Sequence, residues 1–110
     1  MIIKVWKEHD LYLVNELPKK VQKVVKENAQ VLVGEYGAER TEKDLGGYIA
    51  IVDEPGIEEL KQHQLKGIMT EYIDYIEGTD YISVLFLCSS DFAIVVICNK
   101  ELKDLIEKVD

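Results

Sequence analysis

The stretch Tyr81–Lys100, YISVLFLCSSDFAIVVICNK, contains two apolar runs separated by the polar tetrapeptide Cys88-Ser89-Ser90-Asp91. Val, Ile, Phe and Leu favour strands. Ser and Asp favour turns, because their side chains bond to nearby backbone groups. Two apolar runs joined by a short turn predict a β-hairpin. Neither run alternates between apolar and polar residues, so we expect both faces of this hairpin to be covered.

The same tetrapeptide could hold a nucleophile, since it contains a cysteine and two serines. A nucleophilic Cys or Ser needs a base, usually His, and a cationic setting. The chain has two histidines, His9 and His63, and neither lies in a known nucleophile motif. Asp91 would disfavour the thiolate of Cys88. We therefore interpret the tetrapeptide as a turn and do not expect an enzyme.

The hairpin also predicts the state of the two cysteines. Cys98 is expected opposite residues 81–83, which lie five to seven residues from Cys88. That separation is roughly 16–23 Å at about 3.3 Å per strand residue. A disulfide needs Cα atoms about 5.5 Å apart. Both cysteines are therefore expected to be free, buried thiols.

Length and composition predict one domain covering residues 1–110, because the chain has 110 residues and is 47% apolar. Two cysteines are too few for a disulfide scaffold. Charged residues interrupt the first ten positions, which argues against a secretory signal, and no apolar run reaches the roughly 18 residues of a membrane helix. Many lysines and isoleucines with a single arginine are typical of an AT-rich bacterial or phage genome. We expect a cytoplasmic protein.

The first half of the chain predicts strands at 2–6 and 11–15, which could form a hairpin, and then a helix at 18–28. In that helix, Lys19, Lys23 and Lys26 form a stripe opposite the valines. Residues 30–36 are interpreted as a strand, and a continuation of the helix is the alternative.

The second half predicts a loop at 37–46, strands at 48–52 and 70–76, a weak helix between residue 57 and Gly67, and an amphipathic C-terminal helix from Leu102 to Val109. These elements predict an α+β domain with a largely antiparallel sheet of about six strands. Two or three short helices would cover one face, with the C-terminal helix last. The other face would then need curled strands or a second copy, so we expect a homo-oligomer.

The net charge of −8 is unevenly distributed: residues 1–34 carry +2, residues 35–91 carry −9 and residues 92–110 carry −1. An acidic middle repels phosphates, so direct binding of nucleic acid is not expected. It would attract another protein with a basic surface. The alternative interpretation is that the acidity only keeps a small domain soluble.

Other patterns do not predict a metal or cofactor site. Glu59 and His63 share a helix face, but a metal site needs three or four ligands. The GxxG of residues 34–37 contains an acid and an aromatic residue, where an RNA-clamping loop needs basic character. Gly46-Gly47 is followed by no phosphate-loop pattern.

The function predicted from these patterns is a small acidic protein-interaction module, such as an adaptor, an inhibitor or an immunity-type protein. A homo-oligomeric accessory protein and a small-ligand binding protein or enzyme with an unrecognised site are the alternatives. Tyrosines also cluster with acids at 71–81, where they could recognise a partner or simply sit at sheet edges. The predicted protein-binding residues lie in or beside the acidic loop and are Tyr36, Glu39, Glu42, Asp44 and Tyr48.

Overall fold

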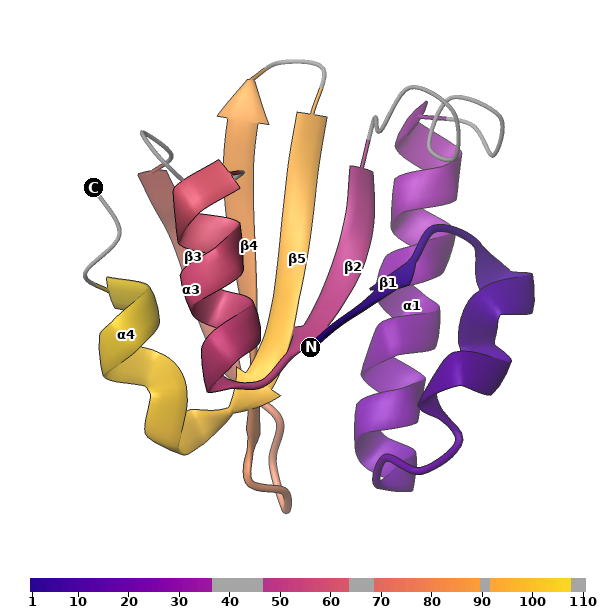
Figure 1. Ribbon diagram of the computed structural model, residues 1–110. Helices are drawn as coiled ribbons and strands as arrows, with labels where there is room; N and C mark the ends of the chain where they lie inside the picture. Colours follow the sequence, from indigo (N-terminus) through magenta and orange to yellow (C-terminus); the bar gives the residue numbers. More distant parts are fainter. Residues whose placement is uncertain (37–46, 64–68, 90–91, 108–110) are drawn as a thin grey trace.

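A computed structural model describes residues 1–36, 47–63, 69–89 and 92–107, which form one sheet with helices on both faces (Figure 1). The sheet has five strands in the order β1-β2-β5-β4-β3. Their bounds are β1 Ile2–Val5, β2 Gly47–Val52, β3 Met69–Tyr75, β4 Tyr81–Ser89 and β5 Phe92–Asn99.

The sheet is mixed, with one parallel pair at its centre. β2 pairs with β5 in parallel, whereas β1–β2, β5–β4 and β4–β3 are antiparallel. The prediction of about six largely antiparallel strands was therefore only roughly right. All six residues of β2 are buried, as expected for a strand that is covered on both faces.

The β4–β5 hairpin confirms the two strands predicted on either side of the tetrapeptide, whereas residues 90 and 91 of the predicted turn lie outside the described residues. Its register places Cys98 opposite Ile82 and Leu87 opposite Ala93. Cys98 is a free, buried thiol. The side chain of Cys88 lies outside the described part of the chain. The strand predicted at 70–76 is β3, and it pairs with β4.

The N-terminal hairpin prediction was wrong, because residues 8–14 form a 3₁₀ helix, η1 Glu8–Val14. The carboxylate of Asp10 accepts hydrogen bonds from the backbone N–H groups of Trp6 and Lys7, at 3.1 and 3.3 Å. These bonds satisfy donors at the start of the turn. β1 consequently pairs with β2, which lies more than 40 residues further along the chain.

The strand predicted at 30–36 was also wrong, and the helical alternative is confirmed. Helix α1 runs without a break over Lys19–Tyr36. Val21, Val25, Ala29 and Leu32 are buried at helical spacing, so the apolar stripe continues past residue 28. Packing of this stripe onto the sheet outweighs the low helix propensity of the valines.

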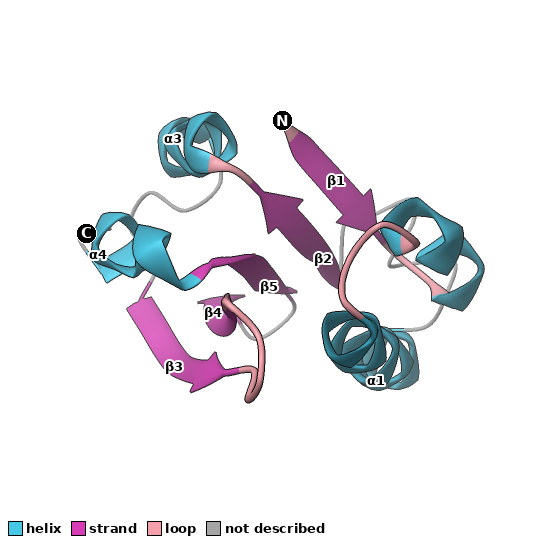
Figure 2. Ribbon diagram, turned by 90° about the horizontal axis from the view of Figure 1, so that it is seen from below, coloured by secondary structure: helices cyan, strands magenta, loops and turns pink. Residues whose placement is uncertain are grey.

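The helices cover both faces of the sheet, not one face as predicted (Figure 2). Helix α3 Glu54–His63 and helix α4 Lys103–Glu107, which follows the short η2 Lys100–Leu102, cover the first face. α1 and η1 cover the second. Alternation along β5 sends Ile94, Val96 and Cys98 into the first core cluster and their neighbours into the second.

The prediction of a homo-oligomer rested on the expectation that one face of the sheet would lack covering helices. In the described structure, helices cover both faces, so this reason no longer applies. The buried residues of β5 pack against helices of the same chain on both faces. The oligomeric state itself stays a prediction. Among the described residues, no helix has the length and apolar character needed to cross a membrane.

Candidate interaction groove

A groove of about 350 Å³ lies between α1 and the outer strands β3 and β4. It exists because, within the sheet, α1 packs chiefly over β2, so Ser83 and Leu85 of β4 are only half-buried on this face. The side chains of β3 and β4 that line it are Tyr72, Asp74, Ser83 and Leu85, and α1 contributes Val24, Glu27, Asn28 and Val31.

Two large apolar side chains stand exposed on opposite walls of this groove. Val31 of α1 is 62% exposed and Tyr72 of β3 is 60% exposed. Below them, Val24, Leu85 and Val95 provide an apolar floor. Single exposed apolar residues are common, but apolar groups that converge on a concave surface are typical of binding sites.

The rim of the groove is acidic. Asp74 is exposed and forms no ion pair with any described residue, and Glu27 makes only a loose pair with Lys23 at 4.0 Å. Such exposed pairs contribute little to stability, so Glu27 can exchange this partner for another. Residues 71–80 contain three further acids and no basic residue, and one of these acids, Asp80, pairs with Lys100 at 3.4 Å. The negative field at this sheet edge therefore favours a cation.

The tyrosines that the sequence groups with these acids do not form one cluster. Successive side chains of a strand point to opposite faces, and the register places Tyr72 toward α1 and Tyr75 toward α4. The Nζ of Lys103 lies 5.7 Å from the centroid of the Tyr75 ring. Only Tyr72 contributes to the groove.

Tyr48, which the sequence places among the interface residues, belongs to the core. Its ring is fully buried and meets the Trp6 ring edge-on, with centroids 6.0 Å apart. The Nζ of Lys4 lies 5.0 Å from the centroid of the same ring. Tyr48 is therefore not available as a surface anchor.

The other predicted interface residues are not placed. Tyr36 is the last residue of α1, and its side chain lies outside the described residues, as do Glu39, Glu42 and Asp44. Sequence reasoning missed Val31 because it assigned residues 30–36 to a strand. It did single out the tyrosines and acids of residues 71–81, which was the available signal for Tyr72 and Asp74.

No cluster of metal ligands is found in the described ranges. They contain no group of three or more His, Cys, Asp or Glu side chains that could hold a metal ion. Burial raises the pKa of the Cys98 thiol to about 12, so this sulfur is a poor nucleophile at neutral pH.

No protein-family model, no curated protein and no solved structure matches this chain.

Proposed function

We propose that this protein is a small protein-interaction module, and that the groove between α1 and the β3–β4 hairpin binds a basic, partly apolar segment of another protein. One observation carries the proposal. The exposed Val31 and Tyr72 face a shared groove whose rim holds the carboxylates of Glu27 and Asp74. An apolar anchor flanked by cations is complementary to both features.

The two features have different effects on binding. Burial of Val31 and Tyr72 against an apolar anchor slows dissociation, since buried aromatic contacts dominate interface energies. The carboxylates accelerate association with a basic segment, and this effect weakens beyond a screening length of about 8 Å at physiological salt. We therefore expect the association rate to fall as salt rises, while the dissociation rate changes little.

Selection from a random peptide library displayed on phage, with the purified protein as bait, tests the proposal. We expect enriched peptides to combine Lys or Arg with a nearby Leu, Phe or Trp. In an NMR titration, a synthetic peptide of this kind should shift the resonances of Val31, Tyr72 and Leu85. Enriched peptides without basic residues, or shifts confined to the α3 and α4 face, would contradict the proposal.

A matched pair of variants distinguishes binding in the groove from nonspecific binding to exposed tyrosines. Tyr72→Ala removes a groove wall, whereas Tyr75→Ala removes a tyrosine of similar exposure, 55%, from the opposite face of the same strand. We expect Tyr72→Ala to weaken peptide binding at least tenfold and Tyr75→Ala to leave it within twofold. Equal losses in both variants would show that the groove is not the site.

The acidic loop enters the proposal from sequence alone. Changing Glu39, Glu42 and Asp44 together to Lys shifts the net charge by +6, from −8 to −2. If the loop steers the same partner, this triple variant slows association and flattens the salt dependence. Unchanged association at every salt concentration would exclude the loop from recognition and leave its acids a solubilising role.

A further inference from the structure

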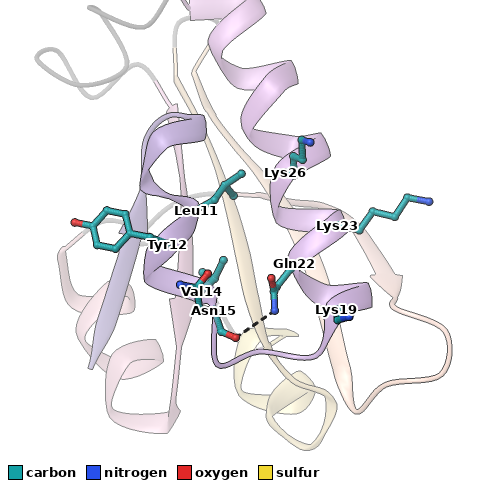
Figure 3. A pocket seen from close by; sticks show the side chains of 8 residues that line it. All are labelled: Leu11, Tyr12, Val14, Asn15, Lys19, Gln22, Lys23 and Lys26. Carbon is teal, nitrogen blue, oxygen red and sulfur yellow. Dashed lines mark hydrogen bonds between the residues drawn. The ribbon is translucent and has the colours of Figure 1, made fainter.

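A second pocket, of about 460 Å³, lies between η1 and the first turns of α1, on the flank of α1 away from the groove (Figure 3). We propose that it binds a small anionic amphiphile, a molecule with a negatively charged head group and a short apolar tail. The volume is in the range of small-molecule sites, roughly 300–1,000 Å³. This site is separate from the proposed peptide groove.

The apolar part of the pocket comes from η1. Leu11 extends from η1 toward α1, as Figure 3 shows, and Val14 is buried beneath it. Neither side chain offers a hydrogen bond. An apolar tail placed here would be removed from water without leaving a polar group unpaired.

The charged part comes from α1. Lys19, Lys23 and Lys26 line the pocket at i, i+4 and i+7, and residues 18–26 contain four lysines and no acid. Lys19 and Lys26 form no ion pair with any described residue, and Lys23 has only the loose contact with Glu27. A cluster of like charges is self-repelling, and a bound anion relieves this repulsion.

The pocket is held in shape before any ligand binds. The side-chain amide of Gln22 donates hydrogen bonds to the carbonyl oxygens of Leu17, at 2.7 Å, and Asn15, at 3.3 Å. These bonds tie the connection between η1 and α1 to the helix, and Figure 3 shows the bond to Asn15. A preformed site needs little ordering when it binds.

The net negative charge of the whole chain, opposite in sign to the lysines of the pocket, restricts the kind of anion that can bind. With a net charge of −8, the protein repels anions at long range. Binding at the pocket therefore depends on short-range contact with the three lysines. Chemistry that pairs an anion with an apolar tail satisfies both halves of the pocket, whereas a free inorganic anion would use only one.

The probe is decanoate, kept below its critical micelle concentration and titrated into the ¹⁵N-labelled full chain. We expect saturable NMR shifts confined to η1 and the first turns of α1. Decanol should bind at least tenfold more weakly, and decyltrimethylammonium should not bind. Equal binding of decanoate and decanol, or shifts that never saturate and spread over the surface, would overturn the proposal.

Two triple variants with the same change of charge provide the control. Lys19, Lys23 and Lys26 are changed together to Gln in the first, and Lys20, Lys61 and Lys100, which do not line the pocket, in the second. We expect the first to lower decanoate affinity at least tenfold and the second less than threefold. Similar losses in both would mean that only net charge matters.

A third arm separates a free ligand from a membrane surface. Vesicles that contain an anionic phospholipid offer the same head-group chemistry, and binding is followed by co-sedimentation. Binding to vesicles without saturable binding of decanoate would refute the small-ligand site. Saturable binding of decanoate that Tyr72→Ala leaves unchanged would support it and show that it is independent of the peptide groove.

Discussion

At the residue scale, Lys4 covers two aromatic rings at the edge of the first core cluster. Its Nζ lies 5.0 Å from the centroid of the Tyr48 ring and 5.9 Å from that of Trp6. A cation over an aromatic face is attracted by the electron density of the ring, and the Lys stem covers apolar surface while its head stays near water. This contact holds Trp6 at the edge of the first core cluster.

Cys98 should be chemically inert in the folded protein. Burial raises the pKa of its thiol to about 12, so at pH 8 about one molecule in ten thousand carries the thiolate. In a Cys88→Ser variant, Ellman's reagent should label Cys98 only at the rate of unfolding, and should label it at once in denaturant. Stoichiometric labelling within seconds under native conditions would contradict the buried position.

Asp53 should make the free energy of unfolding depend on pH in the acidic range. Its carboxylate accepts hydrogen bonds from the Met1 ammonium and, at 2.9 Å, from the N–H of Gly56 at the start of α3. These contacts, the ammonium first, lower the pKa of Asp53 in the folded state. Its stabilising contribution is therefore fully present above the ordinary carboxyl pKa of about 3.9 and is lost as pH falls through the lowered value.

Asp53→Asn measures this contribution, because Asn keeps the shape of a helix cap and removes the charge. We expect the melting temperature of the variant to lie below that of the wild type at pH 7, and the gap to narrow as the pH falls below about 3.9. Glu59→Gln, on the exposed face of the same helix, is the control for general charge effects. A constant gap from pH 7 to pH 3 would rule out the carboxylate as its cause.

At the scale of elements, tertiary packing determines how far helix α1 extends, because the local sequence preference of its last residues is not helical. Residues 30–36 contain two valines and a tyrosine, which locally favour a strand. Leu32 is nevertheless buried one turn after Ala29, and Val31 is exposed at the groove. Continuing the helix buries Leu32 without breaking the hydrogen-bond ladder, whereas a strand would have required a new pairing partner.

Gly34 tests this helix directly. Nothing lies within 4 Å of the position that a Cβ atom would occupy there. In a helix interior, Gly34→Ala should raise the free energy of unfolding by about 0.5–1 kcal/mol, measured by urea denaturation. The same change at Gly78 is the matched control, because its φ of +78° is unfavourable for alanine, and should lower stability by about 1 kcal/mol. A loss of stability at Gly34 would argue against the continuous helix.

At the scale of the whole molecule, the two core clusters share one sheet. β2, β4 and β5 contribute side chains to both faces, so neither cluster can unpack without disturbing strands that the other needs. Single domains of this size usually unfold in one step. We expect the fluorescence of Trp6, the only tryptophan, and far-ultraviolet circular dichroism to give coincident unfolding curves.

Substitution of two leucines on opposite sides of the sheet gives a stricter test of one-step unfolding. Leu60 on α3 is buried in the first cluster and Leu32 on α1 in the second. Each Leu→Ala change should cost about 2–5 kcal/mol through lost burial and the cavity left behind. Both probes should shift together in both variants. Separate shifts, with tryptophan fluorescence following only Leu60→Ala, would show two independent units.

The features that the sequence alone determined are those whose signals lie close together in the chain. The β4–β5 hairpin and its register follow from two apolar runs around one turn. β3 and the C-terminal helix were likewise readable from local patterns. In each case the residues whose pattern predicts the element are also the residues that pair or pack to form it. The partners are therefore close together in the chain, and few other pairings compete.

The tertiary structure decided what depends on distant partners. The parallel pairing of β2 with β5 joins segments more than 40 residues apart, and the continuous apolar runs of both strands are compatible with several partners. The position of α1 over β2 keeps it helical and leaves β3 and β4 open on that face. The groove results from this placement, because its walls come from α1 and from β3 and β4, which lie far apart in sequence. The lysine-lined pocket lies instead between η1 and α1, which follow each other along the chain.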